Sequence, residues 1–302
     1  YHSAIDLAER GARVAIVTGF FVPQADPRAA ETDGPLGAVC LAELLMAMGI
    51  ETRLVTDSLC ANAVRIAADA AGIGDGTVCV CDDPSDDWID AFVRHQFSGE
   101  LSHLIAVERV GPSHTFESLV RQQRPNEPPI EAFEAKVAVH SQDHCHNMRG
   151  VIIDEYSGRL HRLFEFVTSE YPQVRTIGIG DGGNEIGMGT IPWEDLEMRL
   201  MGDHSASIPC RIATNWTIIA GTSNWGAYAL AAATALIRNQ SHLLLNWPVE
   251  RHEQILSEMV IHGPAVDGVT RCAEPTVDGL PFLTYIQAWE GLRRVCQEAA
   301  EF

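Results

Sequence analysis

The sequence has no long apolar run and comparatively little positive charge. No stretch of its 302 residues reaches the roughly 18 consecutive apolar residues that typify a membrane-spanning helix, so we expect no membrane segment. Lysine and arginine number 21 against 41 aspartates and glutamates, for a formal net charge of −20. A nucleic-acid-binding surface has to neutralise phosphates, and this composition argues against one. The acidity indicates a solvated surface, on which local arginines can still bind an anionic substrate.

Several familiar motifs are also absent. The eight cysteines form no C-x-x-C pair, which favours reduced thiols in the cytoplasm, or in the mitochondrial matrix of a eukaryote. Without a G-x-S-x-G segment, a serine hydrolase is not expected. Gly178, Gly180 and Gly183 fit G-x-G-x-x-G, but no acidic residue ends a strand about 20 residues later, so neither nicotinamide nor flavin is expected. The run 144–146 (His-Cys-His) has no second ligand pair at zinc-finger spacing.

Apolar, β-branched runs alternate with alanine- and leucine-rich segments along the chain. We expect strands at residues 13–18, 51–56, 77–81, 103–107, 174–179 and 212–220. We expect helices at residues 38–48, 61–71, 87–97, 160–171, 226–238, 248–260 and 282–300. This alternation is typical of an α/β fold with a mostly parallel, doubly wound (Rossmann-like) sheet covered by helices on both faces. No linker divides the chain, so we expect a single domain over residues 1–302, with a lid or insertion around 112–146.

The most informative segment is residues 177–189, in which six of thirteen residues are glycine. It follows an expected strand, and open α/β sheets bind ligands at the carboxyl ends of their strands. The oxygens of Asp181, Asn184 and Glu185 suit Mg²⁺ or Mn²⁺, and they equally suit an ammonium group. The amides of Gly182 and Gly183 can approach a ligand closely. A purely structural role, in which these side chains cap a following helix, is the alternative.

Two further segments belong to the same expected edge of the sheet. Thr18 and Gly19 end the first strand, and a polar turn then leads into a helix. That turn contains Glu31, Thr32, Asp33 and Gly34. Backbone N–H groups at a helix entrance form a natural seat for a carboxylate or phosphate, so we predict that this turn binds substrate. A turn with no ligand is the alternative.

Polar residues follow later strands in the same way. Glu108 and Arg109 end the fourth strand, where Arg109 could clamp a carboxylate and Glu108 could act as a base; a structural ion pair is the alternative. Asn147 and Arg149 stand in a polar run and favour contact with an anion. Ser223 and Asn224 open an alanine-rich helix, either as caps or as part of an anion site.

Taken in order, the segments 17–20, 31–37, 108–112, 147–150, 178–189 and 223–226 resemble the D-glutamate cyclase-like C-terminal domain family. The glycine-rich segment is the most specific of them, and the resemblance covers nearly the whole chain. It implies a lyase that converts D-glutamate to 5-oxo-D-proline with loss of water. It further implies the stand-alone bacterial form of the domain, whereas the animal form is the second half of a larger mitochondrial protein.

Lactam formation requires a neutral amine, an activated γ-carboxyl group and a folded substrate. We hypothesise that Asp181 or Glu185 accepts the ammonium proton or anchors a divalent ion, and that Arg109 or Arg149 holds the α-carboxylate. The amides of Gly182, Gly183 and the 34–37 turn would stabilise the oxyanion. The alternatives are a non-catalytic binder of an amino acid or nucleotide, and a different lyase or hydrolase on the same scaffold. The partner is a small acidic amino acid, and the alanine-rich helices permit a homodimer.

Overall fold

The structure, a computed structural model that describes residues 1–300, is built on one six-stranded parallel sheet. Its strands are β1 (Arg13–Thr18), β4 (Glu51–Thr56), β5 (Val78–Val80), β6 (His103–Val107), β7 (Arg175–Gly180) and β8 (Trp216–Ile219). Their order is β5-β4-β1-β6-β7-β8, and every neighbouring pair runs parallel. This is the doubly wound order of Rossmann-like folds, so the expected fold class is confirmed.

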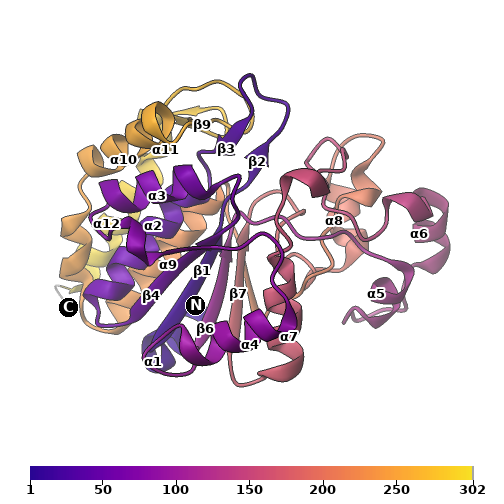
Figure 1. Cartoon of the computed structure of the whole chain (residues 1–302), viewed down its shortest axis with the longest axis horizontal. Helices are drawn as coiled ribbons and strands as arrows, with labels where there is room; N and C mark the ends of the chain where they lie inside the picture. The colour runs from indigo at the N-terminus through magenta and orange to yellow at the C-terminus, as the bar shows by residue number, and fades with distance from the viewer. Residues whose placement is uncertain (301–302) are drawn as a thin grey trace.

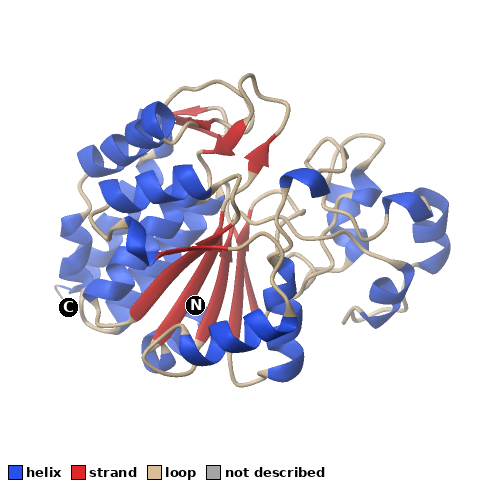
Figure 2. Cartoon of the chain, in the orientation of Figure 1, coloured by secondary structure: helices blue, strands red, loops and turns tan. Residues whose placement is uncertain are grey.

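Helices cover both faces of the sheet (Figures 1 and 2). On one side, a single core joins the sheet to α1 (His2–Arg10), α2 (Pro35–Ala47), α3 (Ala61–Ala70), α9 (Ser223–Ile237), α10 (Val249–His262) and α12 (Gln287–Ala300). The other face packs against α4 (Asp86–His95) and α7 (His161–Glu170). Along β1, Val14 and Ile16 join the first core, whereas Ala15 and Val17 join the second. Because strand side chains alternate between faces, a strand buried on both sides reads as one continuous apolar run.

Three differences between the expected and the observed elements bear on the fold. Helix α1 was not expected, and it contributes only small residues and Leu7 to the core. The single helix expected at 282–300 is two helices, α11 (Phe282–Tyr285) and α12. Strand β8 starts at Trp216 rather than at 212, because the Ile212 carbonyl accepts hydrogen bonds from Gly187 (2.9 Å) and Gly189 (3.1 Å). The glycine-rich segment thus bonds to the carbonyl of Ile212, at the position where the strand was expected to begin.

A small three-stranded sheet lies beyond the carboxyl ends of the main strands (Figure 1). It consists of β2 (Phe21–Val22), β3 (Ala29–Glu31) and β9 (Ala265–Val266). A hairpin of β10 (Thr276–Val277) and β11 (Leu280–Pro281) follows β9. Short 3-10 helices occupy Asp75–Thr77, Val139–Ser141, Asp154–Tyr156, Ser205–Ser207 and Ser241–Asn246. The C-terminal part of the chain therefore returns to the loops that follow β1.

A lateral lobe, formed by α5 (Phe116–Arg121), α6 (Ile130–Lys136) and α8 (Trp193–Arg199), stands beside the main sheet (Figure 1). Its own small core is Leu119, Phe133, Val137, Trp193 and Ala206. The lobe includes much of the segment 112–146, for which a lid or insertion remains our prediction. None of the helices within residues 1–300 is both long and apolar enough to cross a bilayer.

Candidate functional site

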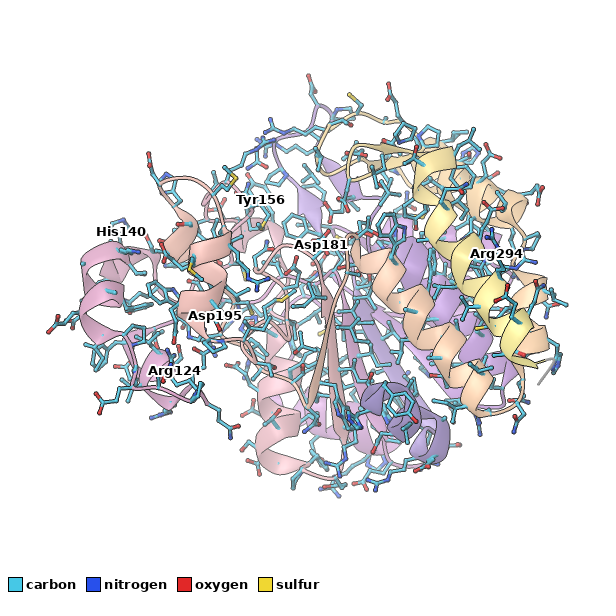
Figure 3. All side chains as sticks on the ribbon, turned by 180° about the vertical axis from the view of Figure 1, so that it is seen from behind. Arg124, His140, Tyr156, Asp181, Asp195 and Arg294 are labelled. Carbon is cyan, nitrogen blue, oxygen red and sulfur yellow. The ribbon has the colours of Figure 1, made fainter. Side chains whose placement is uncertain are left out.

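A cavity of about 330 Å³ lies at the carboxyl edge of the sheet, where the chain order reverses between β1 and β6. Open α/β sheets bind their ligands at this switch point. Figure 3 shows Asp181 at this edge, at the end of β7. The cavity is lined by Phe20, Val22, Gln24, Glu31, Glu108, Asn147, Met148, Arg149, Asp181, Gly182, Asn184, Glu185, Gly268, Val269, Arg271 and Asp278.

The floor of this cavity is a cluster of carboxyl groups. Carboxylate oxygens of Asp33, Asp181 and Asp278 all lie within 4.8 Å of one another, and so do those of Glu108, Asp181 and Glu185. Asp181 belongs to both groups. Glu31 also lines the floor, and its strand β3 carries it there from the small sheet.

Burial and mutual repulsion keep protons on this floor. The pKa of Asp181 is raised far above its ordinary value by burial and then by the charges of Glu108 and Glu185. The pKa values of Glu31 and Glu108 are also raised well above normal, again by burial first and by neighbouring carboxylates second. Burial raises the pKa of Asp278 to about 6. Buried like charges are costly unless protons or a cation neutralise them, and the raised pKa values correspond to protons held on the floor.

The glycine-rich loop folds back onto the carboxylate of Glu185. Glu185 is 1 % exposed and accepts hydrogen bonds from the amides of Gly182 and Gly183, each at 2.7 Å, and of Asp181 at 3.3 Å. Gly183 has a φ of 123°, which favours glycine. The amides of Gly182 and Gly183 already have an acceptor, which corrects our expectation that they stabilise an oxyanion. Glu185 shapes the loop that presents Asp181.

The entrances of α2 and α9 cap each other. The Asp33 carboxylate accepts hydrogen bonds from the amides of Ser223 (2.8 Å) and Asn224 (2.9 Å) at the start of α9. In return, the Asn224 side-chain oxygen accepts from the amides of Gly34 (2.9 Å) and Gly37 (2.6 Å) at the start of α2. The 34–37 amides are therefore not a free seat for an anion, which corrects that expectation.

Arg109 lies behind the cavity in a buried ion pair. Its guanidinium is 2.6 Å from the Asp57 carboxylate and donates to the carbonyl oxygens of Gly19 (2.8 Å) and Gly158 (2.7 Å). The side chain is 1 % exposed and is not part of the cavity lining. The geometry corresponds to the structural ion pair named above as the alternative, and Arg149 is the predicted carboxylate contact that does reach the cavity.

Two arginines, Arg149 and Arg271, line the cavity without a partner. Within residues 1–300, neither guanidinium forms an ion pair or a hydrogen bond with another side chain or the backbone. They face a cavity that also contains five lining carboxyl groups. The cavity therefore combines an acidic floor with two unpaired cations.

The residues predicted from the sequence fall into two groups. Eight line the cavity: Glu31, Glu108, Asn147, Arg149, Asp181, Gly182, Asn184 and Glu185. Nine lie outside the lining: Thr18, Gly19, Thr32, Asp33, Gly34, Arg109, Gly183, Ser223 and Asn224. Several of the second group hold the first in place: Ser223, for example, donates its hydroxyl to Glu108 at 2.5 Å.

Sequence reasoning missed the contribution of residues 268–278. Gly268, Val269, Arg271 and Asp278 all line the cavity. A signal was present, because Asp-Gly between short apolar runs is typical of a two-residue hairpin turn. Asp278 and Gly279 form that turn between β10 and β11, with φ values of 52° and 75°. Phe20, Val22 and Met148 were also missed, since an apolar cavity wall leaves no distinctive pattern, and so was Gln24, which stands alone in the loop after β2.

A larger recess of about 800 Å³ lies beside α5 and the start of β7. Several of its polar groups pair with one another or with the backbone. Arg211 pairs with Asp143 at 2.8 Å and also with Glu165, and Thr214 donates its hydroxyl to the Trp216 carbonyl at 2.8 Å. The acidic cavity, with its unpaired groups, is the better candidate for the functional site.

The fold is that of an α/β protein with a Rossmann-like sheet, and a polar cavity lies at its switch point. A family model described as "D-glutamate cyclase-like, C-terminal" matches residues 1–126 and 129–293, and the chain belongs to that family. The chain is 27 % identical over 297 residues to the human protein named "D-glutamate cyclase, mitochondrial". That match covers 89 % of this chain but 43 % of the human protein, so the chain spans less than half of its relative's length.

Proposed function

We propose that this protein is a lyase that converts D-glutamate to 5-oxo-D-proline with loss of water. The observation that carries the proposal is the charge arrangement of the cavity, which places buried carboxyl groups on its floor and two unpaired arginines among its lining. An amino dicarboxylate complements both, with its ammonium group toward the floor and its carboxylates toward the guanidinium groups. Membership of the D-glutamate cyclase-like family supports the same substrate.

The chemistry follows from the acidic floor. The substrate ammonium first displaces a proton from the floor; the ionised Asp181 or Glu108 then accepts one proton from the ammonium, and the freed amine attacks the γ-carboxyl carbon. A C–N bond forms, one C–O bond breaks, and the oxygen leaves as water with protons that return from the floor. The sum of these steps consumes no net proton. The cavity holds the extended substrate in a folded conformation, which removes much of the entropic barrier to ring closure.

The donor set also fits a divalent cation, and we include Mg²⁺ or Mn²⁺ in the proposal. Asp181 would hold it together with Glu108 and Glu185 or with Asp33 and Asp278, and carboxylate oxygens are the preferred ligands of both ions. Asn184 adds a second observation: it lines the cavity, is 1 % exposed, and its side-chain oxygen accepts no hydrogen bond. Such an ion would polarise the carboxyl group under attack.

The test is a turnover assay on purified protein. D-glutamate and L-glutamate are incubated separately, with and without added Mn²⁺, and the products are separated by chiral chromatography with mass detection. We expect 5-oxo-D-proline from D-glutamate, and we expect Asp181→Asn to abolish it. The matched control is Asp195→Asn, an exposed aspartate on α8 of the lateral lobe that does not line the cavity (Figure 3). Binding of D-glutamate with no product under any condition would reject the enzyme in favour of a binding protein.

A further inference from the structure

Each unpaired arginine of the cavity stands on a turn that a single side chain organises. On one wall, Asn147 is 8 % exposed, and its side-chain oxygen accepts hydrogen bonds from the amides of Arg149 (2.9 Å) and Val151 (3.1 Å). Asn184 of the glycine-rich loop donates to the carbonyl oxygen of His146 at 2.8 Å and ties the turn to the floor. The backbone that presents Arg149 is therefore fixed.

The turn on the other wall is built around Asp267, which is fully buried. Its carboxylate accepts four hydrogen bonds, from the amides of Val269 (2.9 Å), Thr270 (2.8 Å) and Gly279 (2.7 Å) and from the hydroxyl of Thr276 (2.7 Å). One side chain thus fixes both the 268–271 turn and the hairpin that carries the floor residue Asp278.

Arg271 has a backbone conformation that few residues adopt. Its φ is 63°, in the left-handed region, and its amide donates to the Asp267 carbonyl at 2.8 Å. A non-glycine residue in this region is strained by about 1–3 kcal/mol and persists only where the surroundings hold it. Gly268 lies close to the floor, because a Cβ there would stand 2.1 Å from a carboxylate oxygen of Glu31. The turn therefore packs directly against the acidic cluster while it presents an arginine.

We propose that Arg271 and Arg149 each bind one carboxylate of the substrate, so that the cavity selects amino dicarboxylates over amino acids with a single carboxylate. This inference rests on the proposed function for the identity of the substrate, but not on turnover. A floor lined by carboxyl groups offers no cation to a carboxylate, so a ligand whose ammonium lies on the floor has to bind both carboxylates at cations elsewhere in the cavity. Among the cavity-lining residues, Arg149 and Arg271 are the two cations. A guanidinium binds a carboxylate through two parallel hydrogen bonds, which lysine cannot reproduce.

The experiment measures binding by calorimetry and turnover in parallel, with wild type, Arg149→Met, Arg271→Met and Arg271→Lys. The control is Arg294→Met, an exposed arginine on α12 (Figure 3). Methionine, like arginine, is unbranched at Cβ, so the substitution should leave the backbone strain at position 271 unchanged. We expect each cavity Arg→Met variant to weaken D-glutamate binding by roughly 10–100-fold, the usual cost of losing a charged hydrogen-bonded pair. Arg271→Lys should restore only part of the loss, and Arg294→Met should match wild type.

Binding of D-glutamine, whose side chain ends in a neutral amide, shows which arginine faces the γ-carboxylate and which faces the α-carboxylate. The variant that lacks the arginine facing the γ-carboxylate should discriminate least between D-glutamate and D-glutamine. If Arg271→Met binds D-glutamate as tightly as Arg294→Met with an unchanged melting temperature, the inference is overturned. It is also overturned if wild type binds D-alanine as tightly as D-glutamate. Should wild type bind D-glutamate without turning it over, the proposed function fails, while the effect of Arg271→Met on binding still decides this inference.

Discussion

The Asp57 carboxylate lies 2.6 Å from the Arg109 guanidinium, and both side chains are 1 % exposed. The pair sits just behind the cavity, because Arg109 follows Glu108 at the end of β6 and also binds the Gly19 carbonyl at the end of β1. It therefore connects the two strands between which the sheet order reverses. A buried charge left without its partner is costly, so the pair should be sensitive to the loss of either member.

Replacing Asp57 by Asn should lower the free energy of unfolding by about 3–5 kcal/mol, because Arg109 would remain buried without a counter-ion. Urea denaturation at neutral pH measures this change. The matched control is Asp83→Asn, since Asp83 is 61 % exposed beside Arg159 and Arg162 and should contribute about 0–1 kcal/mol. Equal effects of the two substitutions would contradict the prediction that the buried Asp57–Arg109 pair contributes more to stability than an exposed pair does.

The same pair predicts a pH dependence of stability. Burial opposes the charge of Asp57, but the charge and hydrogen bond of Arg109, together with hydrogen bonds from the amides of Gly158 and Cys60, outweigh it and lower the pKa of Asp57 below its ordinary value of 3.8. A lowered pKa in the folded state contributes stability that is fully present above 3.8 and is lost as the pH falls through the folded value. The stability gap between wild type and Asp57→Asn should therefore be constant from neutral pH down to that value and then shrink. A gap that shrinks already between pH 7 and 5 would contradict the assignment.

Asn224 should be the most sensitive helix cap in the protein. Its replacement by Ala removes the acceptor for the amides of Gly34 and Gly37, both of which are buried. We expect a loss of about 1–3 kcal/mol in unfolding free energy, the cost of leaving buried donors unsatisfied. The control is Asn62→Ala, an exposed asparagine with one hydrogen bond to the His262 carbonyl, which should change stability little. A melting curve unchanged in Asn224→Ala would refute the reciprocal capping.

Glu185 should act through the shape of the glycine-rich loop. In wild type, the amides of residues 181–183 donate to the two carboxylate oxygens of Glu185. Glu185→Gln replaces one of these oxygens by an NH₂ group, which would face an amide donor. We expect a loss of about 1–3 kcal/mol in stability together with lower kcat, because Asp181 loses its position. Differential scanning calorimetry and the turnover assay measure the two quantities on the same sample. Lower kcat at unchanged stability would instead indicate that Glu185 contacts the substrate directly.

Mn²⁺ should bind to the acidic floor and stabilise the fold. A ligand that binds only the native state raises the melting temperature with its concentration, and a divalent ion relieves the repulsion among Asp181 and its neighbours. We expect thermal stabilisation by Mn²⁺ in wild type and in Asp195→Asn, and its loss in Asp181→Asn and Asp278→Asn. If all four proteins respond equally, Mn²⁺ binds elsewhere and the floor receives the substrate ammonium alone.

The strands were predictable because a strand buried on both faces leaves a continuous apolar run. The expected bounds of 13–18, 51–56 and 103–107 match β1, β4 and β6, and the order of elements gave the fold class. The glycine-rich loop was predictable as part of the site for a related reason, since such a density of glycine serves close backbone contacts. Within it, a Cβ on Gly178 would stand 2.4 Å from the Cα of Gly187.

Which polar groups remain free could not be predicted from the sequence. Arg109 and Arg149 look equally suited to bind a carboxylate, yet only the three-dimensional structure shows that Asp57, about fifty positions earlier, neutralises Arg109. The amides at 34–37 likewise have an acceptor, Asn224, from a distant helix. Arg271 reaches the cavity because β9 pairs with β3, a contact across more than 200 residues that no local pattern encodes.

The most direct test of the account is the fate of D-glutamate labelled with ¹⁸O at both γ-carboxylate oxygens. Purified protein should release 5-oxo-D-proline that retains one labelled oxygen in its ring carbonyl, while the other leaves in water. Asp195→Asn should behave in the same way, and Asp181→Asn should leave the substrate intact. Unchanged D-glutamate after prolonged incubation with wild type, with and without Mn²⁺, would contradict the central claim that this acidic cavity closes the lactam ring.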